Sequence, residues 1–144
     1  MNKVAGYLRV STDTTDQLNS LTNQALIIKN FNPNITDNDI FADPGLSGTG
    51  LKNRKQFNLL LYKCGINMEV INGQPSYTLS NRKPYYKTII VKNTSRLART
   101  TDIFQIINLL EKKGVEIFFL DLNKSSLNQE ARVMISLMLV LDEQ

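Results

Sequence analysis

Short strand-like segments alternate with helix-like segments along most of this chain, and this alternation is the feature that most restricts its fold. β-prone and apolar residues dominate four short segments, 3–10, 35–41, 87–93 and 115–121. The segments that follow them carry apolar residues at helical spacing. The order β-α-β-α-β-α-β-α predicts an α/β domain with a mostly parallel four-stranded sheet and helices on both faces.

Capping and helix-breaking residues predict the helix boundaries. The first helix ends before Pro33, and the second starts near Arg54. The third follows an N-cap at residues 101–102 and ends at Gly114, where a C-terminal cap belongs. A final helix begins near residues 127–130.

Residues 64–86 interrupt this alternation. Asn72 and Gly73 form a turn signal between two short β-prone pieces, with Pro75 nearby. We therefore predict a β-hairpin inserted between the second helix and the third strand.

Composition excludes several chemistries. The chain of 144 residues has no histidine and one cysteine, Cys64. An internal disulfide, a Cys/His zinc site and a Ser-His or Cys-His pair are therefore impossible. We expect a reducing, cytoplasmic setting, because the N-terminus lacks the apolar core of a secretory signal and no apolar run is long enough to span a bilayer.

Basic residues are concentrated in the middle of the chain. Between Asp43 and Asp102 there are ten basic residues and one acidic residue, Glu69. Such asymmetry favours a polyanionic partner, although a solvated basic face without a partner would have the same composition.

Three polar clusters follow three of the predicted strands. Residues 7–11 (YLRVS) place Ser11 just past the first strand, residues 43–48 (DPGLSG) follow the second, and residues 95–99 (SRLAR) follow the third. Ligands of open α/β sheets bind beyond the carboxyl ends of the strands. We therefore expect these clusters to meet at one edge.

A hydroxyl group among arginines suits attack on a phosphodiester. Negative charge builds on the non-bridging oxygens during such an attack, and arginine offers permanently charged donors that match a phosphate. The alternative is structural: Ser11 would be a helix N-cap and the arginines would form surface ion pairs.

The three clusters together resemble the serine recombinase family of resolvases, invertases and phage integrases, in the family's order and over essentially the whole chain. The resemblance implies that Ser11 is the nucleophile that becomes linked to a DNA 5′ phosphate, and that Arg9 binds phosphate beside it. It implies that Arg96 and Arg99 clamp the scissile phosphate.

The resemblance also implies supporting roles. Gln24 corresponds to a helix glutamine at the same site, and Arg54 to an arginine at the start of the second helix. The loop that shapes the pocket is matched by Asp43, Ser47 and Gly48. Ser95 stands where small resolvases often have aspartate, which favours the large serine recombinase subgroup.

The family resemblance further implies double-stranded DNA as partner, a homodimer that assembles to a tetramer on DNA, and chemistry without metal, ATP or another cofactor. The general base and acid are not identified by any residue pattern. The Arg82, Lys83 and Lys87 side chains of the inserted hairpin either reach DNA or are merely solvated.

The C-terminal residues carry a broad apolar stripe that continues to the end of the chain. In the family a long dimerisation helix begins here. We therefore expect a catalytic domain at residues 1–128 and the start of that helix at 129–144, cut within the helix and lacking the DNA-binding domain. A helix of the core is the alternative.

Two rival functions remain open. One is a non-catalytic module, either a degenerate recombinase or a flavodoxin-like domain, that binds a phosphate or a partner. The other is a metal-dependent nuclease. A covalent adduct that depends on Ser11 distinguishes the recombinase from the first, and resistance to EDTA distinguishes it from the second.

Overall fold

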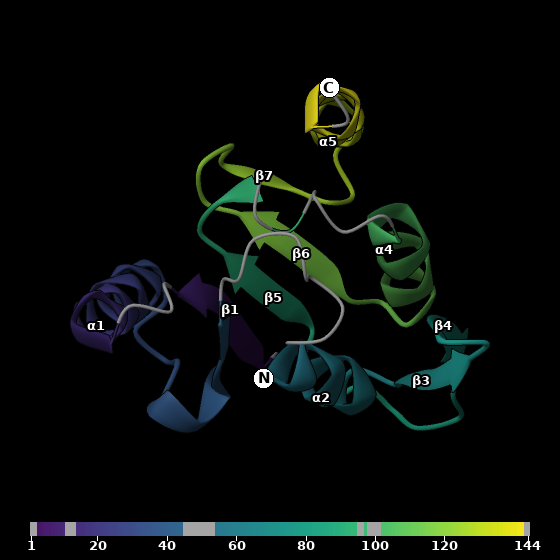
Figure 1. Ribbon diagram of the computed structural model, residues 1–144, viewed down its shortest axis with the longest axis horizontal. Coiled ribbons are helices and arrows are strands. Elements are labelled where there is room, and N and C mark those ends of the chain that lie inside the picture. Colours follow the sequence, from purple (N-terminus) through teal and green to yellow (C-terminus); the bar gives the residue numbers. More distant parts are fainter. Residues whose placement is uncertain (1–2, 11–13, 45–53, 95–96, 98–101, 143–144) are drawn as a thin grey trace.

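The computed structural model of the chain describes residues 3–10, 14–44, 54–94, 97 and 102–142. Its elements run in the order β1 (Val4–Val10), α1 (Thr14–Phe31), η1 (Asp37–Asp39), β2 (Ile40–Pro44), α2 (Lys55–Lys63), β3 (Ile66–Ile71), β4 (Gln74–Leu79), β5 (Thr88–Val91), α4 (Ile103–Lys112), β6 (Glu116–Phe119), β7 (Lys124–Ser125) and α5 (Gln129–Asp142). The predicted α/β class is confirmed (Figure 1).

The central sheet has the strand order β2-β1-β5-β6-β7. The four predicted strands are parallel to their neighbours, and the two-residue β7 adds an antiparallel edge that the sequence analysis did not predict. A residue pattern two positions long carries no periodicity, so this strand has no sequence signal.

Helices cover both faces of the sheet, as predicted (Figure 1). On one face Leu8 and Ile90 pack with Ile28 of α1. On the other face Tyr7 and Ile89 belong to the larger core, together with buried residues of α2, α4 and α5. Successive residues of β1 thus alternate between the two cores, which is the two-residue period of a strand.

The second strand begins later than predicted. The sequence predicts residues 35–41, whereas β2 spans Ile40–Pro44 and is preceded by the 3-10 turn η1. The Thr36 backbone N–H and hydroxyl both donate to Asp39 Oδ2, at 3.1 and 3.0 Å. These local bonds hold the chain in a turn and compete with extension into the sheet.

The predicted hairpin is confirmed as the antiparallel pair β3–β4, a separate two-stranded sheet. Its turn residues Asn72 and Gly73 both have positive φ angles, 53° and 77°. A two-residue hairpin turn of this kind requires that conformation, which asparagine and glycine tolerate best.

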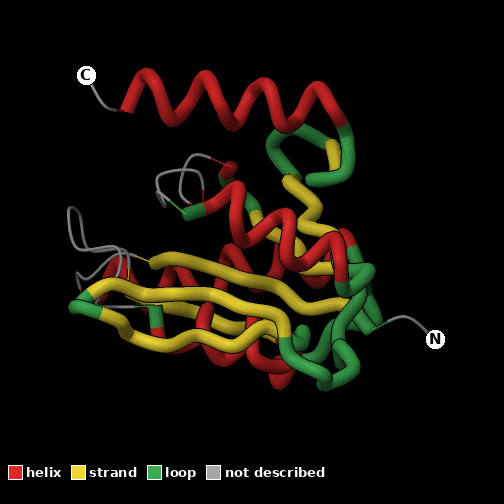
Figure 2. The backbone as a smooth tube through the Cα atoms, turned by 90° about the vertical axis from the view of Figure 1, so that its right-hand side faces the viewer, coloured by secondary structure: helices red, strands yellow, loops and turns green. Residues whose placement is uncertain are grey.

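Helix α5 lies apart from the other helices, on the side of the sheet where β7 forms the edge (Figures 1 and 2). Ala131 and Ile135 are fully buried, and Met138 packs against the core. The opposite face of α5 leaves Val133, Leu137 and others exposed. No helix among the described residues is long and apolar enough to cross a membrane.

Candidate active site

The strand order brings the three polar clusters to neighbouring positions. Strands β2, β1 and β5 are adjacent and parallel, so their carboxyl ends lie at one edge of the sheet, at the left of Figure 2. Strand β1 ends at Val10, immediately before Ser11. Strand β2 ends at Pro44 within the second cluster, and β5 ends four residues before Ser95.

Several of the predicted site residues lie outside the described residues, so the structure gives no geometry for them. They are Ser11, Ser47, Gly48, Ser95, Arg96 and Arg99. Four other predicted site residues are described: Arg9, Gln24, Asp43 and Arg54.

Arg9 and Gln24 line the same small pocket, with a volume of about 20 Å³. Lys92 and Asn93, which directly follow β5, also line it. Arg9 is half-buried, and its Nη2 donates to the Pro44 carbonyl oxygen at 2.9 Å. The pocket therefore gathers two predicted site residues and adds a lysine, Lys92, which sequence reasoning did not single out.

Asp43 is buried beside Arg9 and supports the local structure. The two residues are register partners in β1 and β2. Its Oδ2 accepts hydrogen bonds from the Tyr7 hydroxyl at 2.8 Å and the Phe57 backbone N–H at 2.9 Å, and its Oδ1 accepts one from the Gln56 backbone N–H at 2.9 Å.

Those hydrogen bonds place a carboxylate at the first turn of α2, where free N–H groups and the helix dipole favour negative charge. Burial, and next the Asp43 carboxylate, raise the pKa of Tyr7 well above its ordinary value. The Tyr7 hydroxyl therefore stays protonated and remains a donor to Asp43 at neutral pH.

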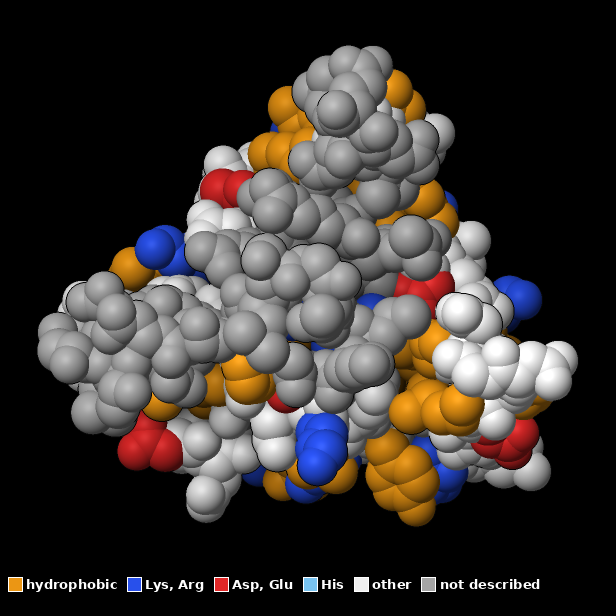
Figure 3. All heavy atoms as spheres, in the orientation of Figure 1, with side chains coloured by type: hydrophobic (Ala, Val, Ile, Leu, Met, Phe, Trp, Pro, Cys, Tyr) orange, Lys and Arg blue, Asp and Glu red, His pale blue; other side chains and the backbone are white. Residues whose placement is uncertain are grey.

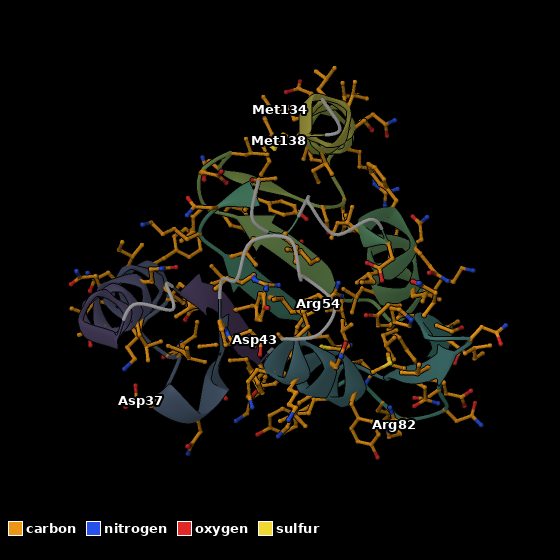
Figure 4. The ribbon with its side chains drawn as sticks, viewed as in Figure 1. Asp37, Asp43, Arg54, Arg82, Met134 and Met138 are labelled. Carbon is orange, nitrogen blue, oxygen red and sulfur yellow. The ribbon has the colours of Figure 1, made fainter. Side chains whose placement is uncertain are left out.

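Arg54 is the N-cap residue of α2, and only 2% of its side chain is exposed. Its Nη2 donates to the Tyr77 hydroxyl at 2.9 Å, and its Nη1 lies 3.6 Å from Asp102 Oδ1. Asp43 accepts from the backbone amides two and three residues after Arg54, and Figure 4 labels the side chains of Asp43 and Arg54. The described partners of Arg54 are thus protein groups, and the guanidinium is enclosed rather than presented at the surface.

A further anchor at this edge was missed by sequence reasoning. Thr94 is fully buried, its backbone N–H donates to Asp121 Oδ2 at 2.9 Å, and its hydroxyl donates to Asp121 Oδ1 at 2.5 Å. Asp121 follows β6, and Thr94 follows the neighbouring strand β5. These hydrogen bonds therefore tie together the segments that leave the two strands. The sequence signals are weak, because Thr94 directly follows the predicted strand 87–93 and Asp121 is the last residue of the predicted strand 115–121.

The family comparison gives a match over most of the chain. The family described as the N-terminal domain of resolvase matches residues 4–69 and 78–144. The chain belongs to the resolvase family of serine recombinase catalytic domains. Membership in a recombinase family implies DNA as its partner and identifies the domain as that of a site-specific recombinase.

A solved structure supports the fold of this recombinase domain. The N-terminal catalytic domain of TP901-1 integrase aligns with a TM-score of 0.54 and 19% sequence identity, over 99% of this chain and 95% of that one. No curated protein matches the sequence significantly.

The matched segments leave out residues 70–77 of the recombinase domain, which form the tip of the hairpin β3–β4. The part of the hairpin without a family counterpart is therefore shorter than the predicted insertion of residues 64–86. It includes Tyr77, the partner of Arg54.

Proposed function

We propose that this recombinase domain cleaves and rejoins DNA through a covalent 5′-phosphoserine intermediate, with Ser11 as the nucleophile. The supporting observation is the strand order β2-β1-β5, since it places the ends of three motif-bearing strands side by side. Arg9 and Gln24 also support it, since they line one small pocket at the carboxyl ends of β1 and β5.

In the proposed reaction the Ser11 oxygen attacks the phosphorus of a phosphodiester. The new bond joins that oxygen to phosphorus, the bond from phosphorus to the 3′ oxygen breaks, and the 3′ oxygen takes up a proton as the serine hydroxyl loses one. Arg9, Arg96 and Arg99 stabilise the charge on the phosphate oxygens. Because one phosphate diester replaces another, rejoining needs no ATP, and the proposed chemistry uses no metal ion.

The proposed roles of the remaining site residues are supporting ones. Gln24 contacts the phosphate region, and Asp43 holds the first turn of α2 against β1. Ser47 and Ser95 contribute to the pocket, and Arg54, held by the Tyr77 hydroxyl, supports it from within the protein.

We also propose that residues 1–128 form the catalytic domain and that α5 begins a dimerisation helix. The apolar face of α5 that points away from the core supports this. The proposed assembly is a homodimer that pairs to a tetramer on two DNA sites.

The decisive experiment traps the adduct. Because the target site is unidentified, the probe is randomly nicked genomic DNA from the source organism, in which a nick near the attacked phosphate lets the short product diffuse away and blocks rejoining. We expect the full-length protein to yield a denaturant-resistant adduct that Ser11→Ala abolishes, while Ser136→Ala, at an exposed serine of α5, retains it.

The linkage and the cofactor requirement are read from the same adduct. Mass spectrometry should place the nucleotide on Ser11, and the DNA should resist a 5′ exonuclease but not a 3′ exonuclease. The yield should not change with EDTA or without nucleotide. An adduct that persists in Ser11→Ala contradicts the proposal, sensitivity to EDTA favours a nuclease, and no adduct from the wild type favours a non-catalytic module.

A further inference from the structure

A buried polar contact joins three elements next to the candidate site. Arg54 caps α2, Tyr77 belongs to β4 and Asp102 is the N-cap residue of α4. Besides its hydrogen bond to Tyr77 and its ion pair with Asp102, the Arg54 guanidinium lies over two rings. Its central carbon is 5.0 Å from the Phe57 ring centre and 6.0 Å from that of Tyr77. The contact therefore links the hairpin to the starts of both helices.

Of the three residues in this contact, Tyr77 is the one that lies outside the segments matched by the family. It is 3% exposed, whereas Thr78 and Leu79, the next residues of β4, are exposed. Its hydroxyl accepts from Arg54 and donates to Asn58 Oδ1 at 3.3 Å, so its donor and an acceptor position are both used. The hairpin tip outside the family match thus contributes a buried side chain to the edge that carries the site.

The ion pair alone does not hold Arg54 in place. Arg54 Nη1 and Asp102 Oδ1 are both buried, and neither has a hydrogen-bond partner among the described residues. Their separation of 3.6 Å is longer than a charge-assisted hydrogen bond. A buried charge pair without complete hydrogen bonding gains little from its attraction, because desolvation opposes it. The hydroxyl of Tyr77, at 2.9 Å, is the well-formed contact of this guanidinium.

The position of Asp102 connects this contact to the proposed reaction. Asp102 accepts, through its carbonyl oxygen, the backbone N–H of Ile106 in the first turn of α4. Arg99 stands only three positions earlier in the sequence. A shift of Arg54 would therefore reach the first turn of α4 through Asp102.

We propose that Tyr77 is a positioning residue for strand cleavage: its hydroxyl holds Arg54 against Asp102 and so fixes the first turn of α4. The inserted hairpin is then a brace for the site rather than a solvated appendage. The effect on cleavage rests on the proposed function, whereas the effect on α4 does not.

The first test is Tyr77→Phe, which removes the hydroxyl and keeps the buried ring. We expect adduct formation at saturating nicked genomic DNA to slow by about tenfold, the loss of roughly one hydrogen bond to a charged group. The affinity for DNA should not change. Tyr62→Phe, at an exposed tyrosine of α2, is the matched control and should react like the wild type.

A double mutant tests whether Tyr77 acts through Arg54. In an Arg54→Met background the hydroxyl has no guanidinium to hold, so adding Tyr77→Phe should cause no further loss. If the two losses multiply, Tyr77 acts independently of Arg54 and the proposal is wrong. A Tyr77→Phe protein that cleaves at the wild-type rate also overturns it.

Amide hydrogen exchange gives a readout that needs neither cleavage nor the Arg54 variant. We expect Tyr77→Phe to speed exchange in the first turn of α4, at Ile106 and its neighbours, while the amides of α1 exchange as in the wild type. Unchanged exchange in α4 overturns the proposal. If the wild type forms no adduct but α4 responds, the proposed function fails and the role of Tyr77 as a brace stands.

Discussion

Asp43 illustrates how a residue expected in the pocket also supports the structure. Its two oxygens take three hydrogen bonds, from Tyr7 and from two backbone amides at the start of α2. These bonds join β1, β2 and α2 at the edge where the proposed chemistry occurs. The sequence placed Asp43 past the second strand, whereas it lies within β2. Its partners were not revealed either, because they come from segments distant along the chain.

Asp43→Asn should destabilise the domain. Whichever way the amide turns, its NH₂ group faces a backbone donor and leaves that donor unpaired, at a cost of about 1–3 kcal/mol. Urea unfolding measures the loss. Asp37→Asn, at an exposed residue paired with Lys29, is the control and should change stability by less than about 0.5 kcal/mol. Equal effects of the two substitutions would contradict the assigned role.

The Asp39 carboxylate should make the stability of the folded protein depend on pH. Burial tends to raise its pKa, but hydrogen bonds from the Thr36 backbone, the Tyr86 hydroxyl and the Thr36 hydroxyl, together with the charge of Lys3, lower the pKa below its ordinary value. A carboxylate with a lowered folded pKa stabilises the protein above its unfolded pKa, and this stabilisation is lost as pH falls through the folded pKa.

The destabilisation caused by Asp39→Asn should therefore be largest near neutral pH and shrink as the pH falls through the lowered folded pKa, where Asp39 of the wild type takes up its proton. Unfolding curves from pH 3 to pH 7 test this. A destabilisation that is constant over this range would mean that the carboxylate charge is not involved.

At the scale of elements, the close packing of α1 on β1 depends on Gly6. A Cβ atom at Gly6 would lie 3.0 Å from Ile28 Cγ2 and 3.1 Å from Ile28 Cδ1. Ile28 is fully buried. A side chain at residue 6 must therefore push α1 away from the sheet or move Ile28 from its place in the core.

Substitutions at Gly6 should reduce stability in proportion to side-chain size. Gly6→Val is expected to cost about 1–3 kcal/mol through overpacking, and Gly6→Ala less. Denaturant unfolding measures both. Combining Gly6→Ala with Ile28→Val should cost less than the sum of the single losses, because the smaller side chain makes room. Strict additivity would show that the two residues do not compete for the same space.

The elements that the sequence predicted well are those with a strong local signal. The Asn72-Gly73 turn and the Gly114 helix end both have the positive φ angles that their residue types favour. The second strand was misplaced because Ile35 is apolar and buried yet lies before the turn η1. An apolar residue such as Ile35 gives the same sequence pattern whether it is buried in a strand or in a turn. Here the hydrogen bonds between Thr36 and Asp39 favour the turn.

At the scale of the whole molecule, α5 presents an apolar face to the exterior. Val133, Leu137 and Val140 are each more than half exposed, and hydrophobic side chains gather around this helix in Figure 3. In Figure 4, Met134 and Met138 lie on the same helix. Exposed apolar residues at this spacing suit a helix that packs against a second copy.

We expect Val133→Lys combined with Leu137→Lys to convert a dimer to a monomer, because each lysine places a charge in the apolar contact. Sedimentation velocity over a range of concentrations measures the change. Asn23→Lys with Asn30→Lys, which adds the same charge to exposed positions of α1, should leave the dimer intact. A wild-type chain that is monomeric at every concentration would contradict the proposed role of α5.

The sequence by itself determined the α/β class, the four parallel strands, the hairpin and the family, because periodicity, turn residues and short motifs are local properties of the chain. The tertiary structure alone decided that Arg9 and Gln24 share a pocket with Lys92, that Asp43 bonds to Tyr7, and that Tyr77 encloses Arg54. The physical reason is that such contacts depend on the order of strands in the sheet and on where the hairpin packs against the helices. Both are set by packing between segments that are far apart in sequence, and no local pattern encodes them.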